Sequence, residues 1–120
     1  MSLFRAISID VHVALEALAA PLLFVAPFVL GFSYLAGAFS IVVGILLLGL
    51  ATSAYGSEMR ASLPLSAHAG HDYTLAAGPI VAGIVAGIAG DYIATVFLVG
   101  FGSAHLALTA STRFSRPLGA

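Results

Sequence analysis

Five residue types are missing from this 120-residue sequence: cysteine, lysine, asparagine, glutamine and tryptophan. Without cysteine, the chain can form no disulfide, no thiolate metal site and no thiol nucleophile. Charged residues make up 8% of the chain, against about 25% in a typical soluble domain, while hydrophobic residues reach 61%. A water-soluble fold needs more polar surface than this, so we expect most of the chain to be surrounded by lipid.

Other absences narrow the possible functions. A net charge of −1 provides no basic surface for nucleic acid. No glycine loop followed by lysine and serine or threonine is present to bind phosphate, and no Gly-x-Ser-x-Gly sequence marks a nucleophilic serine. Asp10, His12 and Glu16 interrupt the first apolar stretch, which argues against a cleaved secretory signal.

The charged residues divide the chain into apolar segments that are long enough to cross a membrane. Residues 17–57 carry no charge and suffice for two crossings of about 20 residues each, with a glycine-flanked turn at 31–37. Two further uncharged segments follow an expected loop at 57–72. The sequence therefore predicts an all-α, integral membrane four-helix bundle, a single domain over residues 1–120, with spans at about 11–31, 36–56, 73–90 and 92–112.

The arginines predict the orientation of this bundle. Arg5, Arg60, Arg113 and Arg116 lie at the N-terminus, in the 57–72 loop or at the C-terminus, and the opposite side has no basic residue. By the positive-inside rule, the side with the arginines faces the cytoplasm. We therefore expect a multi-pass protein of the cell (inner) membrane with both termini cytoplasmic. At the other side, Asp91 is expected to cap the last helix.

Small residues indicate how the helices pack. Gly83 and Gly87 are four positions apart in the third span, and Gly37, Ser40 and Gly44 share a face of the second. Such faces allow helix backbones to approach each other closely in lipid. This pattern fits packing within one chain, and it also fits a homodimer seam along the third helix.

The two halves of the chain resemble each other weakly. In the first half His12 precedes Pro21 by nine residues, and in the second half His71 precedes Pro79 by eight. This internal repeat predicts two tandem transmembrane hairpins related by an axis along the membrane normal.

Residues 26–33, Ala-Pro-Phe-Val-Leu-Gly-Phe-Ser, and residues 40–46, Ser-Ile-Val-Val-Gly-Ile-Leu, resemble the SPW-repeat membrane proteins. These are small bacterial proteins built from two-helix repeats around a Ser-Pro-Trp motif. The resemblance covers roughly residues 15–52, with Ala26 and Phe28 in place of the serine and tryptophan of the motif. It implies a membrane location and a hairpin fold, and it implies no activity.

Ionisable side chains inside the expected spans are candidate functional residues, because they are costly in hydrocarbon. His12 and Glu16 are four positions apart and share a helix face. His105 lies at a depth similar to that of Glu16 on the antiparallel fourth helix, and it shares a face with Gly102 and Thr109. We therefore expect Glu16 and His105 to meet inside the bundle.

Three kinds of site fit these residues. His12, Glu16, His71, Asp72 and His105 supply the histidine and carboxylate ligands that suit zinc or iron. His12 and His105 could instead be axial ligands of a haem or another tetrapyrrole. Alternatively, a Glu16–His105 pair could relay protons or simply hold two helices together. His68 fits an ordinary interfacial residue of the expected loop.

These observations predict a small membrane subunit. It would be an accessory or cofactor-binding component of a larger membrane assembly or of a homo-oligomer, so its partners would be the lipid bilayer and other membrane subunits or copies of itself. A metal- or haem-dependent membrane enzyme or electron carrier is the first alternative. A small proton-coupled transporter is the second. The sequence leaves open whether the protein is an enzyme.

Overall fold

A computed structural model of the chain describes residues 5–54 and 64–115. Within these ranges the chain is almost entirely helical, which confirms the predicted all-α fold of four helices. Two very short strands flank the first and last helices. In chain order the elements are β1 (Ile7–Ser8), α1 (Ile9–Leu30), α2 (Tyr34–Ser53), α3 (Leu65–Ile88), α4 (Tyr92–Ala110) and β2 (Thr112–Arg113).

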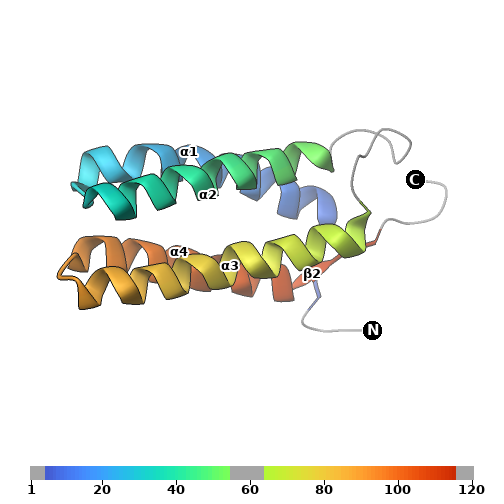
Figure 1. Cartoon of the computed structure of the whole chain (residues 1–120). Coiled ribbons are helices and arrows are strands. Elements are labelled where there is room, and N and C mark those ends of the chain that lie inside the picture. Colours follow the sequence, from blue (N-terminus) through green and yellow to red (C-terminus); the bar gives the residue numbers. More distant parts are fainter. Residues whose placement is uncertain (1–4, 55–63, 116–120) are drawn as a thin grey trace.

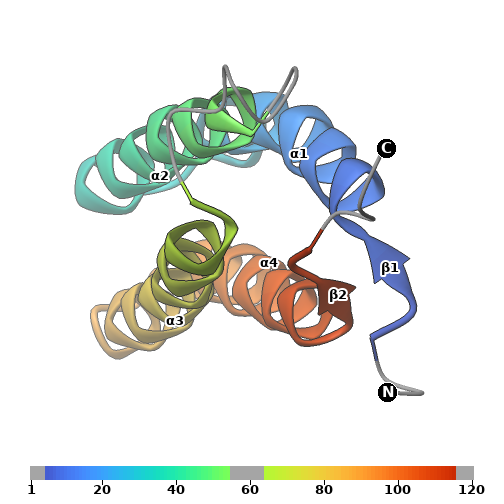
Figure 2. The same ribbon diagram turned by 90° about the vertical axis from the view of Figure 1, so that its right-hand side faces the viewer.

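The helices form two hairpins that lie against each other. Helices α1 and α2 pair along their length, as do α3 and α4, and the contacts between the two hairpins are fewer. Figure 1 shows the α1–α2 hairpin above the α3–α4 hairpin, with both tight turns at the same end of the molecule. The view along the helices shows the four helices side by side in two layers (Figure 2).

Three of the helices are long and apolar enough to cross a membrane: α1, α2 and α4. Their outward faces carry large apolar side chains such as Leu18, Phe28 and Leu35, which are exposed. Helix α3 is less apolar because its first two turns contain His68, His71 and Asp72. An apolar exterior around a more polar interior is the pattern expected of a protein whose solvent is lipid.

The two tight turns are built alike and are tied to each other. Gly31 and Gly90 have φ values of 71° and 95°, in the left-handed region that glycine adopts without strain. Asp91 caps α4 by accepting a hydrogen bond from the backbone N–H of Ala94, as predicted, and it accepts a second from the N–H of Ser33 at 2.8 Å. These backbone donors stabilise the carboxylate and hold the pKa of Asp91 below its ordinary value.

A serine of α2 supplies the hydrogen bond that a proline inside α1 cannot form. Pro27 has no backbone N–H, so the carbonyl of Leu23 one turn earlier loses its helical partner. The hydroxyl of Ser40 donates a hydrogen bond to that carbonyl at 2.7 Å. Gly37 leaves room for Pro27, whose side chain would lie 3.3 Å from a Cβ at that position. The small-residue face predicted on the second helix is therefore an intrachain packing face.

Helix α3 begins eight residues earlier than predicted. The spans were delimited by charge, which placed everything up to Asp72 outside the membrane, but the helix starts at Leu65. Pro64 occupies the N-cap position, and its carbonyl accepts the first helical hydrogen bond from the N–H of His68. The predicted loop is thus helical over 65–72, and residues 57–63 lie outside the described part of the chain.

Helices α3 and α4 approach each other closely through glycines. A Cβ at Gly83 would lie 2.8 Å from the side chain of Val99, and one at Gly102 would lie 2.5 Å from the carbonyl oxygen of Ala76. Both distances are too short for a carbon atom to occupy. Gly83 and Gly87 of the third span therefore serve packing within the chain, against α4.

Gly102→Ala is expected to destabilise the protein by about 1–3 kcal/mol, because the added methyl group forces α4 away from the backbone of α3. Gly100→Ala on the same helix is the matched control, since nothing lies within 4 Å of the added Cβ. Thermal unfolding of the two variants in the same detergent measures the difference. Equal stability of the two variants would show that the close approach at Gly102 is unimportant.

Candidate metal centre

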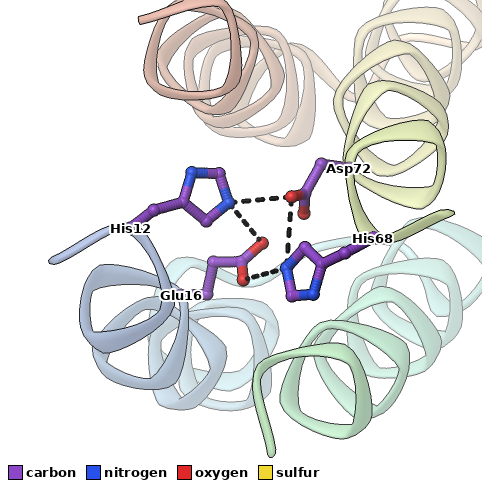
Figure 3. Close-up of side chains that lie close together, drawn as sticks. All are labelled: His12, Glu16, His68 and Asp72. Carbon is purple, nitrogen blue, oxygen red and sulfur yellow. Dashed lines mark hydrogen bonds and ion pairs between the residues drawn. The ribbon is translucent and has the colours of Figure 1, made fainter. Parts of the chain in front are cut away.

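Five ionisable side chains from three helices meet inside the bundle, at the end opposite the two tight turns. They are His12 and Glu16 of α1, His68 and Asp72 of α3, and His105 of α4. The first four are at most 1% exposed, and His105 is 5% exposed. Figure 3 shows four of them pointing toward one another across the space between α1 and α3.

Helix geometry explains how these residues come together. His12 and Glu16 are separated by one helical turn in α1, as are His68 and Asp72 in α3, so each pair projects from a single face. The two faces lie opposite each other near the starts of α1 and α3. His105 reaches the same place from the second half of α4, which runs antiparallel to α1.

The three imidazoles all direct the same nitrogen, Nε2, at the carboxylates. The Nε2 atom of His12 lies 2.8 Å from Asp72 and 3.2 Å from Glu16. That of His68 lies 3.2 Å from Glu16 and 3.3 Å from Asp72. That of His105 lies 3.2 Å from each carboxylate. Each histidine therefore contacts both acids, and the predicted contact between Glu16 and His105 is present.

A threonine hydroxyl determines which ring nitrogen of neutral His12 carries the proton. The hydroxyl of Thr112 donates its single proton to the carbonyl of Leu108 at 2.6 Å. It can therefore only accept from Nδ1 of His12, which lies 2.7 Å away. In the neutral imidazole, Nε2 then carries a lone pair, and this lone pair faces the oxygens of Asp72 and Glu16. Such an arrangement requires a cation, either a proton or a metal ion, between these atoms.

The parallel strands position this threonine. Ile7 pairs with Thr112 and Ser8 with Arg113, which ties the start of α1 to the end of α4. Thr112 is 1% exposed and lies against the first turn of α1. A hydrogen bond from the second ring nitrogen commonly orients a metal-binding histidine and sets its tautomer. Thr112 accepts that hydrogen bond from His12.

The negative charges of the two carboxylates also require cations within the cluster. Two ionised carboxylates buried in a helical bundle are costly unless opposite charge compensates them. One divalent ion with three neutral imidazoles would give a net charge of zero. In the absence of metal, protons on the imidazoles or on the carboxylates must provide the compensation. The site is therefore suited to exchange bound protons for a divalent cation.

The distances fit a coordination shell. For metal–nitrogen and metal–oxygen bonds of about 2.0–2.2 Å, neighbouring ligand atoms are about 2.8–3.6 Å apart. The six contacts between histidine nitrogen and carboxylate oxygen span 2.8–3.3 Å. Donor atoms of His12, Glu16, His68 and Asp72 all lie within 4.8 Å of one another. His105 adds a fifth donor beside both carboxylates.

Two histidines of α3 lie differently from the prediction. His71, proposed as a ligand, is exposed, and its Nδ1 donates to the carbonyl of Ala67. His68, interpreted as a loop residue, is fully buried in the cluster. Both differences follow from the late start predicted for the third helix. In a helix that begins at Leu65, His68 shares the face of Asp72, whereas His71 does not.

A signal for His68 was present in the sequence. The first helix of each hairpin carries a histidine followed four residues later by an acid: His12 with Glu16, and His68 with Asp72. Aligning the halves on these pairs, rather than on His12 and His71, selects the histidine that lies in the cluster.

The haem alternative fits the geometry less well. His12 and His105 are the two axial ligands that this alternative needs. The carboxylates of Glu16 and Asp72 occupy the space beside both Nε2 atoms, where a macrocycle would have to lie. This arrangement favours a single ion over a tetrapyrrole.

Comparison with known proteins returned nothing similar: no family model, curated protein or solved structure matches this chain. The fold and the site define a class nonetheless, namely a small helical protein with apolar helices of membrane-spanning length around a buried cluster of three histidines and two acids. The resemblance to the SPW-repeat proteins stays a prediction.

Proposed function

We propose that this protein is a membrane-embedded metal-binding bundle whose five clustered side chains hold one divalent transition-metal ion. The observation that carries the proposal is the convergence of three buried Nε2 atoms on two buried carboxylates. Buried ionisable groups in a membrane helix are rare and mark functional sites. A metal ion would satisfy all of these donors at a single point.

The donors define the class of metal. Imidazole nitrogen suits zinc, copper, iron and nickel, and carboxylate oxygen suits manganese and harder ions. A set of three nitrogens and two oxygen-bearing groups, with no sulfur, fits Zn²⁺, Fe²⁺ or Mn²⁺ best. Calcium and magnesium prefer shells made of oxygen. Copper(I) prefers sulfur ligands, and the chain has no cysteine.

The proposed setting is the inner leaflet of a cell membrane that all four helices cross. Arg5 and Arg113 flank the described bundle at the end that holds the metal cluster, and the positive-inside rule assigns that end to the cytoplasm. Both termini would then be cytoplasmic, and the metal would lie about one helical turn inside the membrane. Membership of the SPW-repeat family is part of the same proposal.

In this setting the protein would act as a cofactor-bearing subunit. Its described part is little more than four helices around the cluster, which suits a component of a larger membrane assembly or of a homo-oligomer. A metal-dependent membrane enzyme is the second candidate. It is favoured by a pocket that reaches Glu16 and His105 from the outer surface of the helices.

Metal titration tests the proposal. The protein, purified, treated with chelator and placed in lipid nanodiscs, is titrated with Zn²⁺, Mn²⁺ and anaerobic Fe²⁺ by calorimetry. We expect saturable binding of one ion per chain with at least one of these metals, accompanied by release of protons. Absence of binding of all three metals at a buried 1:1 site would refute the proposal.

A further inference from the structure

An apolar groove runs along the outside of the bundle to the metal cluster. It has a volume of about 340 Å³, within the range of about 300–1,000 Å³ that is typical of small-molecule sites. Its walls come mainly from α1 and α4 and include Leu15, Leu22 and Phe101, and α2 contributes Leu47. Leu15 and Leu22 are exposed, so the groove opens on the surface that would face lipid.

The two ionisable residues of this groove belong to the cluster. Glu16 and His105 line it, and the remaining lining residues are aliphatic or aromatic. His105 is also the most exposed of the five cluster residues, at 5%. The side of the cluster that can be approached from outside is therefore the side that faces this groove.

We infer that the groove binds a long-chain amphiphile from the membrane, with the alkyl chain along α1 and α4 and an uncharged oxygen head, a hydroxyl or carbonyl, at the metal beside His105. This inference rests on the proposed function, because the metal supplies the binding site for the head. The occupant follows from the lining: apolar walls open to lipid suit a single alkyl chain, and a polar end with a metal suits a coordinating oxygen.

The charge of the centre selects an uncharged head. A divalent ion balanced by the carboxylates of Glu16 and Asp72 has no net charge when the imidazoles are neutral. A fatty-acid carboxylate would add an uncompensated negative charge next to an apolar groove, which is costly. A hydroxyl or carbonyl oxygen can coordinate the metal without this cost. Long-chain alcohols, aldehydes or amides are the classes of molecule that meet these conditions.

Cobalt spectroscopy tests the inference. The protein in nanodiscs is loaded with Co²⁺, whose visible absorption reports a change in the coordination shell, and is titrated with 1-dodecanol, dodecanoic acid or dodecane. We expect 1-dodecanol to shift the spectrum saturably, and the other two compounds to have little effect. Ala104→Trp fills the groove, and we expect it to raise the concentration of 1-dodecanol needed for half of the shift about tenfold or more.

Ala107→Trp is the matched control, since Ala107 is another exposed alanine of α4 but does not line the groove. We expect it to respond to 1-dodecanol as the unmodified protein does. If Co²⁺ binds but 1-dodecanol leaves the spectrum unchanged, or if Ala104→Trp responds like Ala107→Trp, the inference fails and the metal site stands. A response to dodecanoic acid alone would overturn the choice of an uncharged head. Failure to bind Co²⁺, together with failure to bind Zn²⁺, Mn²⁺ and Fe²⁺, would remove both proposals.

Discussion

His68→Ala is expected to weaken metal binding by at least about 100-fold, whereas His71→Ala, three positions further along the same helix, should leave it unchanged. His68 is fully buried with its Nε2 within 3.3 Å of both carboxylates, whereas His71 is exposed and bonded to a backbone carbonyl of its own helix. Removing His68 deletes a ligand and leaves a cavity beside the metal. Removing His71 deletes a surface imidazole.

Competition between the protein and a chromophoric chelator measures both affinities under the same conditions. The pair is informative because the two variants change the composition of the chain in the same way. Equal losses of affinity in the two variants would indicate that histidines bind metal at the surface. Unchanged affinity in both would exclude His68 from the site.

Removal of the metal is expected to lower the stability of the whole bundle. A ligand present at about 1,000 times its dissociation constant stabilises the folded state by about 4 kcal/mol, because it binds the folded chain and not the unfolded one. Loss of the metal should destabilise both hairpins, because the cluster joins α1 of one hairpin to α3 and α4 of the other. Without the metal, the carboxylates of Glu16 and Asp72 depend on protons for compensation.

Thermal unfolding in detergent with excess metal, and again with excess chelator, measures this stabilisation. We expect metal to raise the unfolding temperature of the unmodified protein and of His71→Ala, and to have little effect on His68→Ala. The gain should shrink as the pH falls, because the ligands must be deprotonated to bind metal and protons compete for them. A metal-independent unfolding temperature in all three proteins would contradict the structural role of the centre.

Much of the fold could be predicted because it depends on simple counts along the sequence. The lengths of the apolar segments predicted the four helices. The glycine-flanked segment at 31–37 predicted the first tight turn, and Asp91, between two uncharged segments, predicted the second. The capping role of Asp91 followed from its place between two apolar segments. Each of these features depends on the chemistry of neighbouring residues, which a single sequence displays directly.

The start of α3 could not be predicted in the same way. A rule that ends a membrane helix at the first charged residue works where charges lie in water, and it placed His68 and Asp72 in a loop. Here Asp72 lies inside the helix because histidines of α1 and α4 compensate its charge. That compensation comes from residues 60 and 33 positions away in the sequence, and local reasoning does not include it.

The candidate site was therefore predicted in part. His12, Glu16 and His105 were selected because they are ionisable and would be costly in lipid, and Asp72 because a loop at the same side of the membrane would hold it as a possible ligand. The structure brings these four together. The choice between His68 and His71 depended on helical register, which depended in turn on where the helix begins. The orienting role of Thr112 on His12 depends on the pairing of β1 with β2, a contact between the two ends of the described chain.

X-ray absorption at the metal edge tests the central claim most directly. The protein, loaded with the metal that titration selects, should give a first shell of nitrogen and oxygen at about 2.0–2.2 Å, with outer-shell scattering from about three imidazole rings. In His68→Ala the imidazole contribution should fall by one ring or the metal should be lost, and in His71→Ala the spectrum should not change. A first shell of oxygen alone, with no imidazole scattering, would contradict the account.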